Sequence, residues 1–265
     1  MTRLAFDDYL QHLRSDSTRL RTVLAGCDPD ARVPGCPDWT AADLLGHHGG
    51  VLDFWATVVE GRPAGPADDA EDPDKPTSYD GLLAYHEEQQ ARLVAALEAA
   101  DPADEAWTWS AEQTVGFTFR RQAHEALIHR LDAEQTAGQV TGLNPALAAD
   151  GVEEALDVIF GGTPPWGSFD GDERYVRVDV TDQGDSVWVR LGRFSGTHPE
   201  SGKVYDEVDL SVVADPGSAP AAVVAGPAAD LDAWLWHRGG DEALQVSGDR
   251  AAYDAFRGVV AQSID

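Results

Sequence analysis

Hydrophobic positions in the first half of the chain recur with the period of an α-helix. Apolar residues three, four or seven positions apart predict four amphipathic helices, at about 6–26, 40–59, 78–100 and 119–137. Asp38 is the expected N-cap of the second helix, Ser78 or Asp80 that of the third, and Gly138 is expected to end the fourth. Four such helices favour a bundle, whose core can hold side chains from facing helices.

The second half changes to strand-like alternation. Residues 175–180 and 186–191 alternate apolar and polar side chains around Gln183-Gly184-Asp185, which predicts a hairpin. Further strands are expected at 208–213 and 221–224, and helices at 145–160, 228–238 and 249–261. The chain is therefore predicted to be α+β overall, with a helical domain at 1–140 and a small α+β domain at 141–265. The segment 61–77, rich in Pro, Gly and Asp, is expected to be a loop.

The net charge of the chain excludes some classes of binding partner. The 265 residues include 47 acids and 19 bases, a net charge of −28. Such a surface repels phosphate backbones and anionic lipids, so neither nucleic acid nor a membrane is expected as a partner. The chain shows no signal-peptide pattern, and its longest apolar stretch is much shorter than the roughly 20 residues that span a bilayer. With two cysteines and no CxxC spacing, the expected location is a reducing cytoplasm.

A histidine and a carboxylate on the fourth predicted helix provide the candidate chemistry. Glu125 and His129 are four positions apart, so a helix projects them from one face. His47, on the second predicted helix, would complete a set of three metal ligands, which leaves one coordination position open, as in catalytic zinc sites. His48 is the alternative ligand if the helix register shifts by one residue; His47 is favoured.

Several motifs resemble those of a known family. The segment from Pro34 to His47 (PGCPDWTAADLLGH) resembles the first motif of the mycothiol-dependent maleylpyruvate isomerase family, whose N-terminal domain is a DinB-like four-helix bundle. The segment from Arg120 to Glu134 (RRQAHEALIHRLDAE) resembles the second motif. Residues 230–238 and 246–249 are similar to the family's sterol-carrier-like C-terminal domain.

This resemblance implies a metal-dependent enzyme. His47, Glu125 and His129 match the family's ligands for a divalent metal, usually zinc. The resemblance also implies mycothiol, a low-molecular-weight thiol of actinobacteria, as cosubstrate, with its thiolate delivered to a small electrophile. The reaction would be isomerisation or S-transfer. Arg238 falls where the second domain can present a basic side chain to a cofactor or substrate carboxylate.

The sequence leaves two interpretations open for the roles of some other residues near the motifs. Arg120 and Arg121 are either contacts for a cofactor carboxylate or an ordinary solvated pair. Asp132 either orients a neighbouring ligand from behind or pairs with a base such as Arg121. Trp39 and Trp55 are expected in the bundle core.

Two other classes of function also fit the sequence. A hydrolase would activate water instead of a thiol and would need a general base, for which His48 or Asp132 could serve. A non-catalytic binding protein could retain the same fold. The sequence selects neither a substrate nor an oligomeric state.

Overall fold

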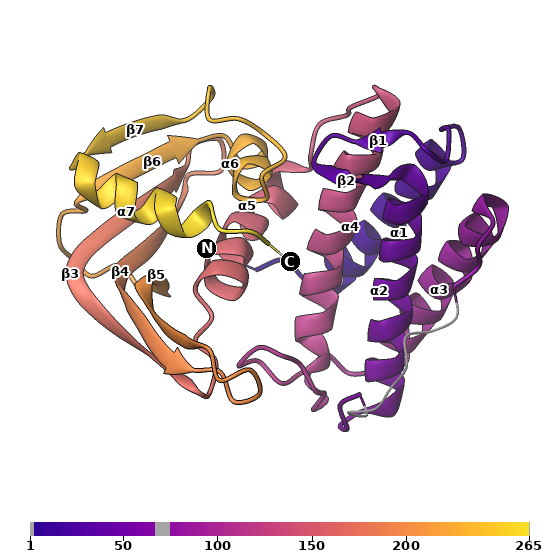
Figure 1. Ribbon diagram of the computed structural model, residues 1–265, viewed down its shortest axis with the longest axis horizontal. Helices are drawn as coiled ribbons and strands as arrows, with labels where there is room; N and C mark the ends of the chain where they lie inside the picture. Colours follow the sequence, from indigo (N-terminus) through magenta and orange to yellow (C-terminus); the bar gives the residue numbers. More distant parts are fainter. Residues whose placement is uncertain (1–2, 67–74, 265) are drawn as a thin grey trace. The chain divides into compact units, whose positions relative to one another are not determined.

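The chain forms two compact units (Figure 1). The computed structural model describes residues 3–66 and 75–264, so residues 67–74 of the predicted polar loop lie outside the described residues. The first unit comprises Leu4–Leu143, and the second comprises the chain from Asn144 onward together with Arg3. The predicted fold class is confirmed: a helical N-terminal unit is followed by a unit built on a five-stranded mixed sheet.

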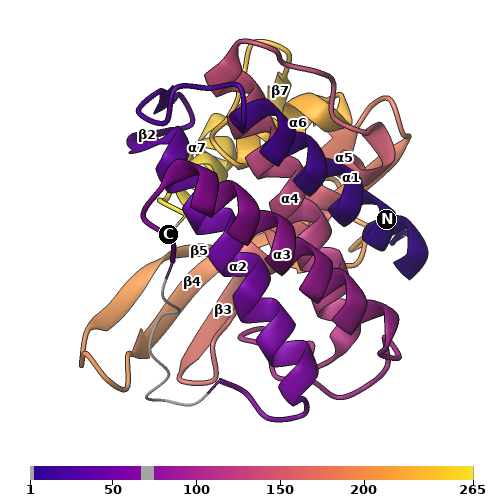
Figure 2. The same cartoon turned by 90° about the vertical axis from the view of Figure 1, so that its right-hand side faces the viewer.

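The first unit contains the four predicted helices. They are α1 (Phe6–Leu24), α2 (Ala41–Gly61), α3 (Tyr79–Glu98) and α4 (Val115–Ala137). α1 packs against α4 and α2 against α3, and Figure 2 shows the second pair running side by side. Leucines at the predicted apolar positions of α1 and α2, such as Leu20 and Leu44, are fully buried between the helices. Burial of these side chains is the main favourable contribution to the stability of the bundle.

The helix ends follow local capping chemistry. The predicted cap at Asp38 is wrong: Thr40 caps α2, because its hydroxyl accepts from the Asp43 N–H while the Asp43 carboxylate accepts from the Thr40 N–H. α4 begins at Val115, earlier than predicted, because the Thr114 side chain caps it. Gly138 ends α4 as predicted, in the left-handed conformation at φ 66°.

Two short strands precede α2. β1 (Arg32–Val33) and β2 (Cys36–Thr40) form an antiparallel pair that the sequence pattern does not predict. β2 has no alternation of buried and exposed positions, and it contains Pro37. This pair leads directly into the Thr40 cap, and it places Trp39 beside the first turns of α2.

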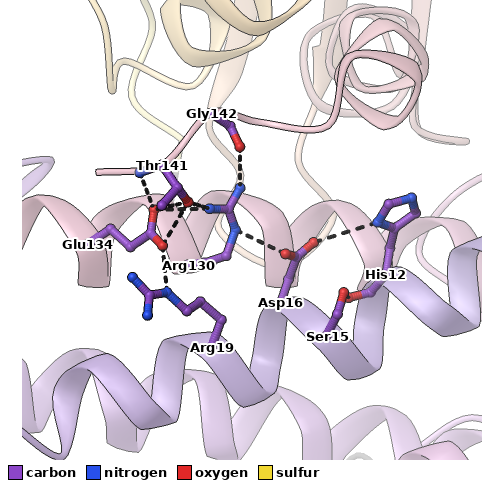
Figure 3. Close-up of polar contacts among 8 residues, drawn as sticks. All are labelled: His12, Ser15, Asp16, Arg19, Arg130, Glu134, Thr141 and Gly142. Carbon is purple, nitrogen blue, oxygen red and sulfur yellow. Dashed lines mark hydrogen bonds and ion pairs between the residues drawn. The ribbon is translucent and has the colours of Figure 1, made fainter. Parts of the chain in front are cut away.

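A network of charged groups joins α1, α4 and the segment after α4 (Figure 3). The Arg130 guanidinium forms ion pairs with Asp16 at 2.9 Å and with Glu134 at 3.0 Å. Arg19 donates to the other oxygen of Glu134 at 2.8 Å, and the Thr141 N–H donates to Glu134 at 2.8 Å. The Glu134 side chain is 0% exposed, so its charge depends on these partners for compensation.

The second unit is built around the sheet β5-β4-β3-β6-β7. Its strands are β3 (Gly167–Val180), β4 (Asp185–Thr197), β5 (Val204–Val213), β6 (Ala222–Gly226) and β7 (Gln245–Gly248). β3 runs parallel to β6, and the other neighbouring strands are antiparallel. The helices of this unit are α5 (Pro145–Glu154), the π-helix η1 (Ala155–Phe160), α6 (Ala228–Leu235) and α7 (Arg250–Val260).

The predicted hairpin is confirmed and is longer than the alternating pattern suggests. Val176 pairs with Val189 and Val178 with Val187, and all four side chains are buried on one face. The turn includes Gly184 at φ 74°, a conformation that favours glycine. Among the described residues, no helix is long and apolar enough to cross a membrane.

We predict that the Glu134→Gln substitution lowers the free energy of unfolding of the helical unit by about 3 kcal/mol, because it removes one of the two carboxylates that compensate the buried Arg130 and leaves Asp16 as the other. Burial alone would raise the pKa of Glu134, but hydrogen bonds from Arg19 and Thr141 and the charge of Arg130 lower it. The lowered pKa means that this stabilisation is complete above the unfolded pKa near 4.5 and is lost as the pH falls further.

Urea unfolding of both proteins at several pH values measures this loss. The control is Asp254→Asn, which removes one partner of the exposed Arg250–Asp254 pair on α7 and should change stability by less than about 0.5 kcal/mol. Equal effects of the two substitutions would contradict the importance of the network.

Candidate metal centre

Three side chains from α2 and α4 converge within the helical unit. Nε2 of His129 lies 3.1 Å from Oε1 of Glu125, and Nε2 of His47 lies 3.5 Å from the same oxygen. The ligand atoms of these residues all lie within 4.8 Å of one another. In residues 3–66 and 75–264, this is the one group of three or more His, Cys, Asp or Glu side chains that meets this criterion.

The helix periodicity explains the convergence. Glu125 and His129 are one turn apart on α4, and their side chains project from the same face of the helix. His47 lies near the N-terminal end of α2, whose start is fixed by the Thr40–Asp43 capping box. The packing of α2 against α3 and α4 then determines which of its residues face α4.

The donor set fits a divalent metal. Two imidazoles and a carboxylate are the ligand types of catalytic zinc, and donor atoms around tetrahedral zinc lie about 3.3 Å apart. The two contacts to Glu125 match that spacing without rearrangement. Side-chain exposure is 37% for His47, 14% for Glu125 and 8% for His129, so the cluster is open to solvent on the His47 side.

Two further residues hold the ligands in place. Asp132 Oδ2 lies 2.9 Å from Nδ1 of His129, which leaves Nε2 of His129 directed at Glu125. Arg121 donates to Oε2 of Glu125 at 3.0 Å, so one carboxylate oxygen is held and the other faces the imidazoles. Of the two interpretations of Asp132, the structure favours orientation of a ligand. Of the two interpretations of Arg120 and Arg121, the ordinary solvated pair is wrong, because each side chain is only 4% exposed; contact with a cofactor carboxylate stays a prediction.

The electrostatics of the metal-free cluster keep a proton on His129. Burial alone would lower the pKa of His129, but the Glu125 charge and hydrogen bonds with Asp132 and Glu125 raise it to about 9. Burial would raise the pKa of Glu125, but His129, His47 and Arg121 bring it well below its usual range. In the metal-free protein, protonated His129 therefore stabilises the fold below pH 6.5, and this contribution is lost as the pH rises through about 9.

His48 lies outside the cluster. It is fully buried, and its Nδ1 lies 2.8 Å from Nε2 of His86 on α3, which sequence reasoning missed. Burial lowers the pKa of His86 to about 3 and that of His48 well below its usual range, so both imidazoles are neutral. The signal that could have identified His86 is its helical spacing from Leu82 and Leu93 on the buried face of α3.

Aromatic side chains surround the cluster. The Trp39 ring lies 4.6 Å from the His47 ring and stacks at 6.0 Å on the His129 ring, measured between centroids. Trp39 is half-buried and also packs against the bundle core, so it is both a core residue and a wall of the site. Trp55 is 4% exposed and belongs to the core, as predicted.

Arg238 belongs to the second unit. It follows α6, and its guanidinium donates to the Trp236 carbonyl at 2.7 Å. Its role in binding a cofactor or substrate stays a prediction.

Family models match both units of the chain. Residues 10–134 match the N-terminal domain of mycothiol maleylpyruvate isomerase, and residues 146–255 match the C-terminal domain of the same family. The chain belongs to the mycothiol maleylpyruvate isomerase family. The DinB-like helical unit predicted from the sequence motifs is therefore the family's N-terminal domain, and the candidate metal ligands all lie in it.

Solved structures of the family share the fold. A crystal structure of a mycothiol-dependent maleylpyruvate isomerase is 16% identical to the chain, with a TM-score of 0.59. A histidine-to-alanine mutant of a mycothiol-dependent maleylpyruvate isomerase is 15% identical, with a TM-score of 0.63. Each match covers 93% of this chain and 96% of the other. No curated protein matches the sequence.

The first prediction from this site concerns metal content. The purified protein should bind about one divalent ion per chain, and alanine at His47, Glu125 or His129 should abolish stoichiometric binding. Asp132→Asn should weaken metal affinity by about 10–100-fold, because it removes the acceptor that orients His129. Elemental analysis and competition with a chelator measure these effects. His12→Ala, outside the cluster in the same bundle, is the control; full metal retention in the three ligand variants would exclude the site.

The second prediction concerns proton release. Since a metal binds neutral imidazole and His129 has a pKa of about 9, each ion should displace about one proton from His129 at neutral pH. The displaced amount should fall as the pH rises through 9. Calorimetric titration of the metal-free protein in buffers of different ionisation enthalpy gives the proton count. A count that does not change between pH 7 and pH 9.5 would contradict the raised pKa of His129.

Proposed function

We propose that this protein is a metal- and mycothiol-dependent enzyme that delivers a thiolate to a small electrophile. The observation that carries the proposal is the convergence of two Nε2 atoms on one oxygen of Glu125, with Arg121 and Asp132 fixing the ligands from behind. Three protein ligands would leave a position for an exogenous group. Family membership supports mycothiol as the thiol.

The chain's own residues would bind and orient the reactants. A divalent metal held by His47, Glu125 and His129 would favour the thiolate form of a bound thiol at neutral pH. The cysteines of the protein do not replace that thiol: neither belongs to the cluster, and burial raises the pKa of Cys27. Trp39 restricts access of water on one side of the two imidazoles.

Two outcomes of thiolate addition fit this site. Addition to an activated cis double bond, rotation about the resulting single bond and elimination of the thiolate yield the trans isomer. Displacement of a leaving group or opening of an epoxide yields a thioether instead, which makes the enzyme an S-transferase. Both begin with the same attack, so the cluster by itself supports either reaction.

The structure does not favour the hydrolase alternative, because neither candidate general base is accessible to water at the cluster. His48 is fully buried and contacts His86, and Asp132 is 0% exposed and contacts Nδ1 of His129. Neither side chain is available to take a proton from water at the cluster. The thiol mechanism needs no such base, because the metal favours the thiolate directly.

We predict that mycothiol binds at the metal. When cobalt replaces zinc, addition of mycothiol should produce a sulfur-to-cobalt charge-transfer band, and an S-methylated analogue should not. An unchanged spectrum at millimolar mycothiol would overturn the thiol mechanism and would favour the hydrolase mechanism instead. If the band appears without isomerisation of maleylpyruvate, the thiol mechanism stands and the substrate is a different electrophile.

The same titration tests Arg238. If its guanidinium binds a carboxylate of the thiol or the substrate, Arg238→Ala should weaken binding or kcat/KM by about tenfold or more while metal content stays unchanged. Arg250→Ala removes an exposed arginine of the same unit and is the matched control. Equal kinetics in wild type and Arg238→Ala would remove Arg238 from the site.

A further inference from the structure

An open cavity lies beside His47 within the helical unit. It has a volume of about 510 Å³ and is lined by the end of β2, the first turns of α2, the start of α3 and Lys75. Trp39 and His47 form one part of the lining, and the apolar Ala42 and Leu82 form another. The cavity therefore shares a wall with the candidate metal centre on the side where the cluster is open.

Lys75 brings a positive charge to this cavity. It is one of two lysines in a chain with 47 acidic residues. Its ammonium lies against α2 at Gly50, three residues after His47: a Cβ built at Gly50 would lie 2.6 Å from Nζ and 2.8 Å from Cε of Lys75. The absence of a side chain at Gly50 thus leaves the space that the ammonium occupies.

Besides His47, the charged side chains in the lining are Asp38, which is exposed, Asp43 and Lys75. Asp43 accepts hydrogen bonds from the N–H and the hydroxyl of Thr40 at 2.8 and 2.6 Å, and these bonds lower its pKa. The Asp43 carboxylate is therefore already hydrogen-bonded as part of the helix cap. Lys75 forms no ion pair with any carboxylate in the described part of the chain. The N–H groups of the Lys75 ammonium can therefore donate hydrogen bonds to a ligand.

Trp39 adds a flat surface to the same cavity. Its ring lies 4.6 Å from the His47 ring between centroids, so a molecule stacked on the exposed part of the indole lies next to the cluster. An aromatic wall, two apolar side chains and one ammonium form a binding site for a flat molecule with an apolar body and a single anionic group.

We propose that this cavity binds an aromatic carboxylate, with the carboxylate paired to Lys75 and the ring placed against Trp39. A substrate held in this way has its acidic end fixed at Gly50 and its remaining part directed past His47. Lys75 is then a specificity-determining residue that selects electrophiles carrying a carboxylate on an aromatic ring. That this ligand is the substrate rests on the proposed function; its binding does not.

Binding of benzoate to the full chain, freed of metal by a chelator, tests the proposal. Removing the metal prevents the probe from being held by coordination. Titrations followed by ligand-observed NMR should show benzoate binding at least about tenfold tighter than benzamide, its neutral counterpart, because the ammonium pairs with the charged group only. Lys75→Met should remove that preference. Lys203→Met, which removes the other lysine, should retain it.

Gly50→Ala is the decisive second variant. It keeps the charge of Lys75 but displaces the ammonium from α2, so it should also weaken benzoate binding. Unchanged benzoate affinity in Lys75→Met would overturn the proposal, as would tighter binding of benzylamine than of benzoate to the wild type. A Lys75-dependent preference in a protein that shows no mycothiol band with cobalt would leave this site intact and remove only the thiol mechanism.

Discussion

The candidate site depends on one half-buried carboxylate. Glu125 presents one oxygen to two imidazoles from different helices and has the other oxygen held by Arg121. A carboxylate in this position would be costly to bury without such partners. The same contacts that compensate its charge also determine the position of His129 and, through it, of Asp132. The proposed metal affinity, proton release and thiol orientation would therefore all derive from one set of interactions around Glu125.

α4 is anchored at both ends of this arrangement. Toward its C-terminus, Arg130 and Glu134 form the network that joins α4 to Asp16 and Arg19 of α1. At its N-terminus, Thr114 caps the first turn. The ion pairs to α1 resist rotation of α4 about its axis, which helps Glu125 and His129 to keep facing α2. The stabilising network of Figure 3 thereby contributes to the geometry of the site without touching it.

The region around His47 would link the proposed metal binding to the proposed choice of substrate. His47 is the most exposed of the three ligands, and its ring contacts Trp39. Lys75 and the capped start of α2 border the same cavity. A chain with a net charge of −28 disfavours anions over most of its surface, whereas the Lys75 ammonium places a positive charge in the cavity beside His47. Recognition of an anionic electrophile can then be local even though the molecule as a whole repels it.

The sequence by itself determined the helices, the hairpin and the candidate ligands, because these depend on short-range periodicity. Glu125 and His129 share a helix face whenever α4 forms, and the alternation around Gln183–Asp185 leaves one way to bury the valines of β3 and β4. The β1–β2 pair was missed, since its residues have no burial alternation, and the cap of α2 was misplaced by two residues. Only the tertiary structure decided that His47, and not His48, faces Glu125, because that choice depends on how α2 is rotated against α3 and α4. The same packing brought His86 to His48 and Lys75 to Gly50, contacts between segments far apart in the sequence that no local pattern encodes.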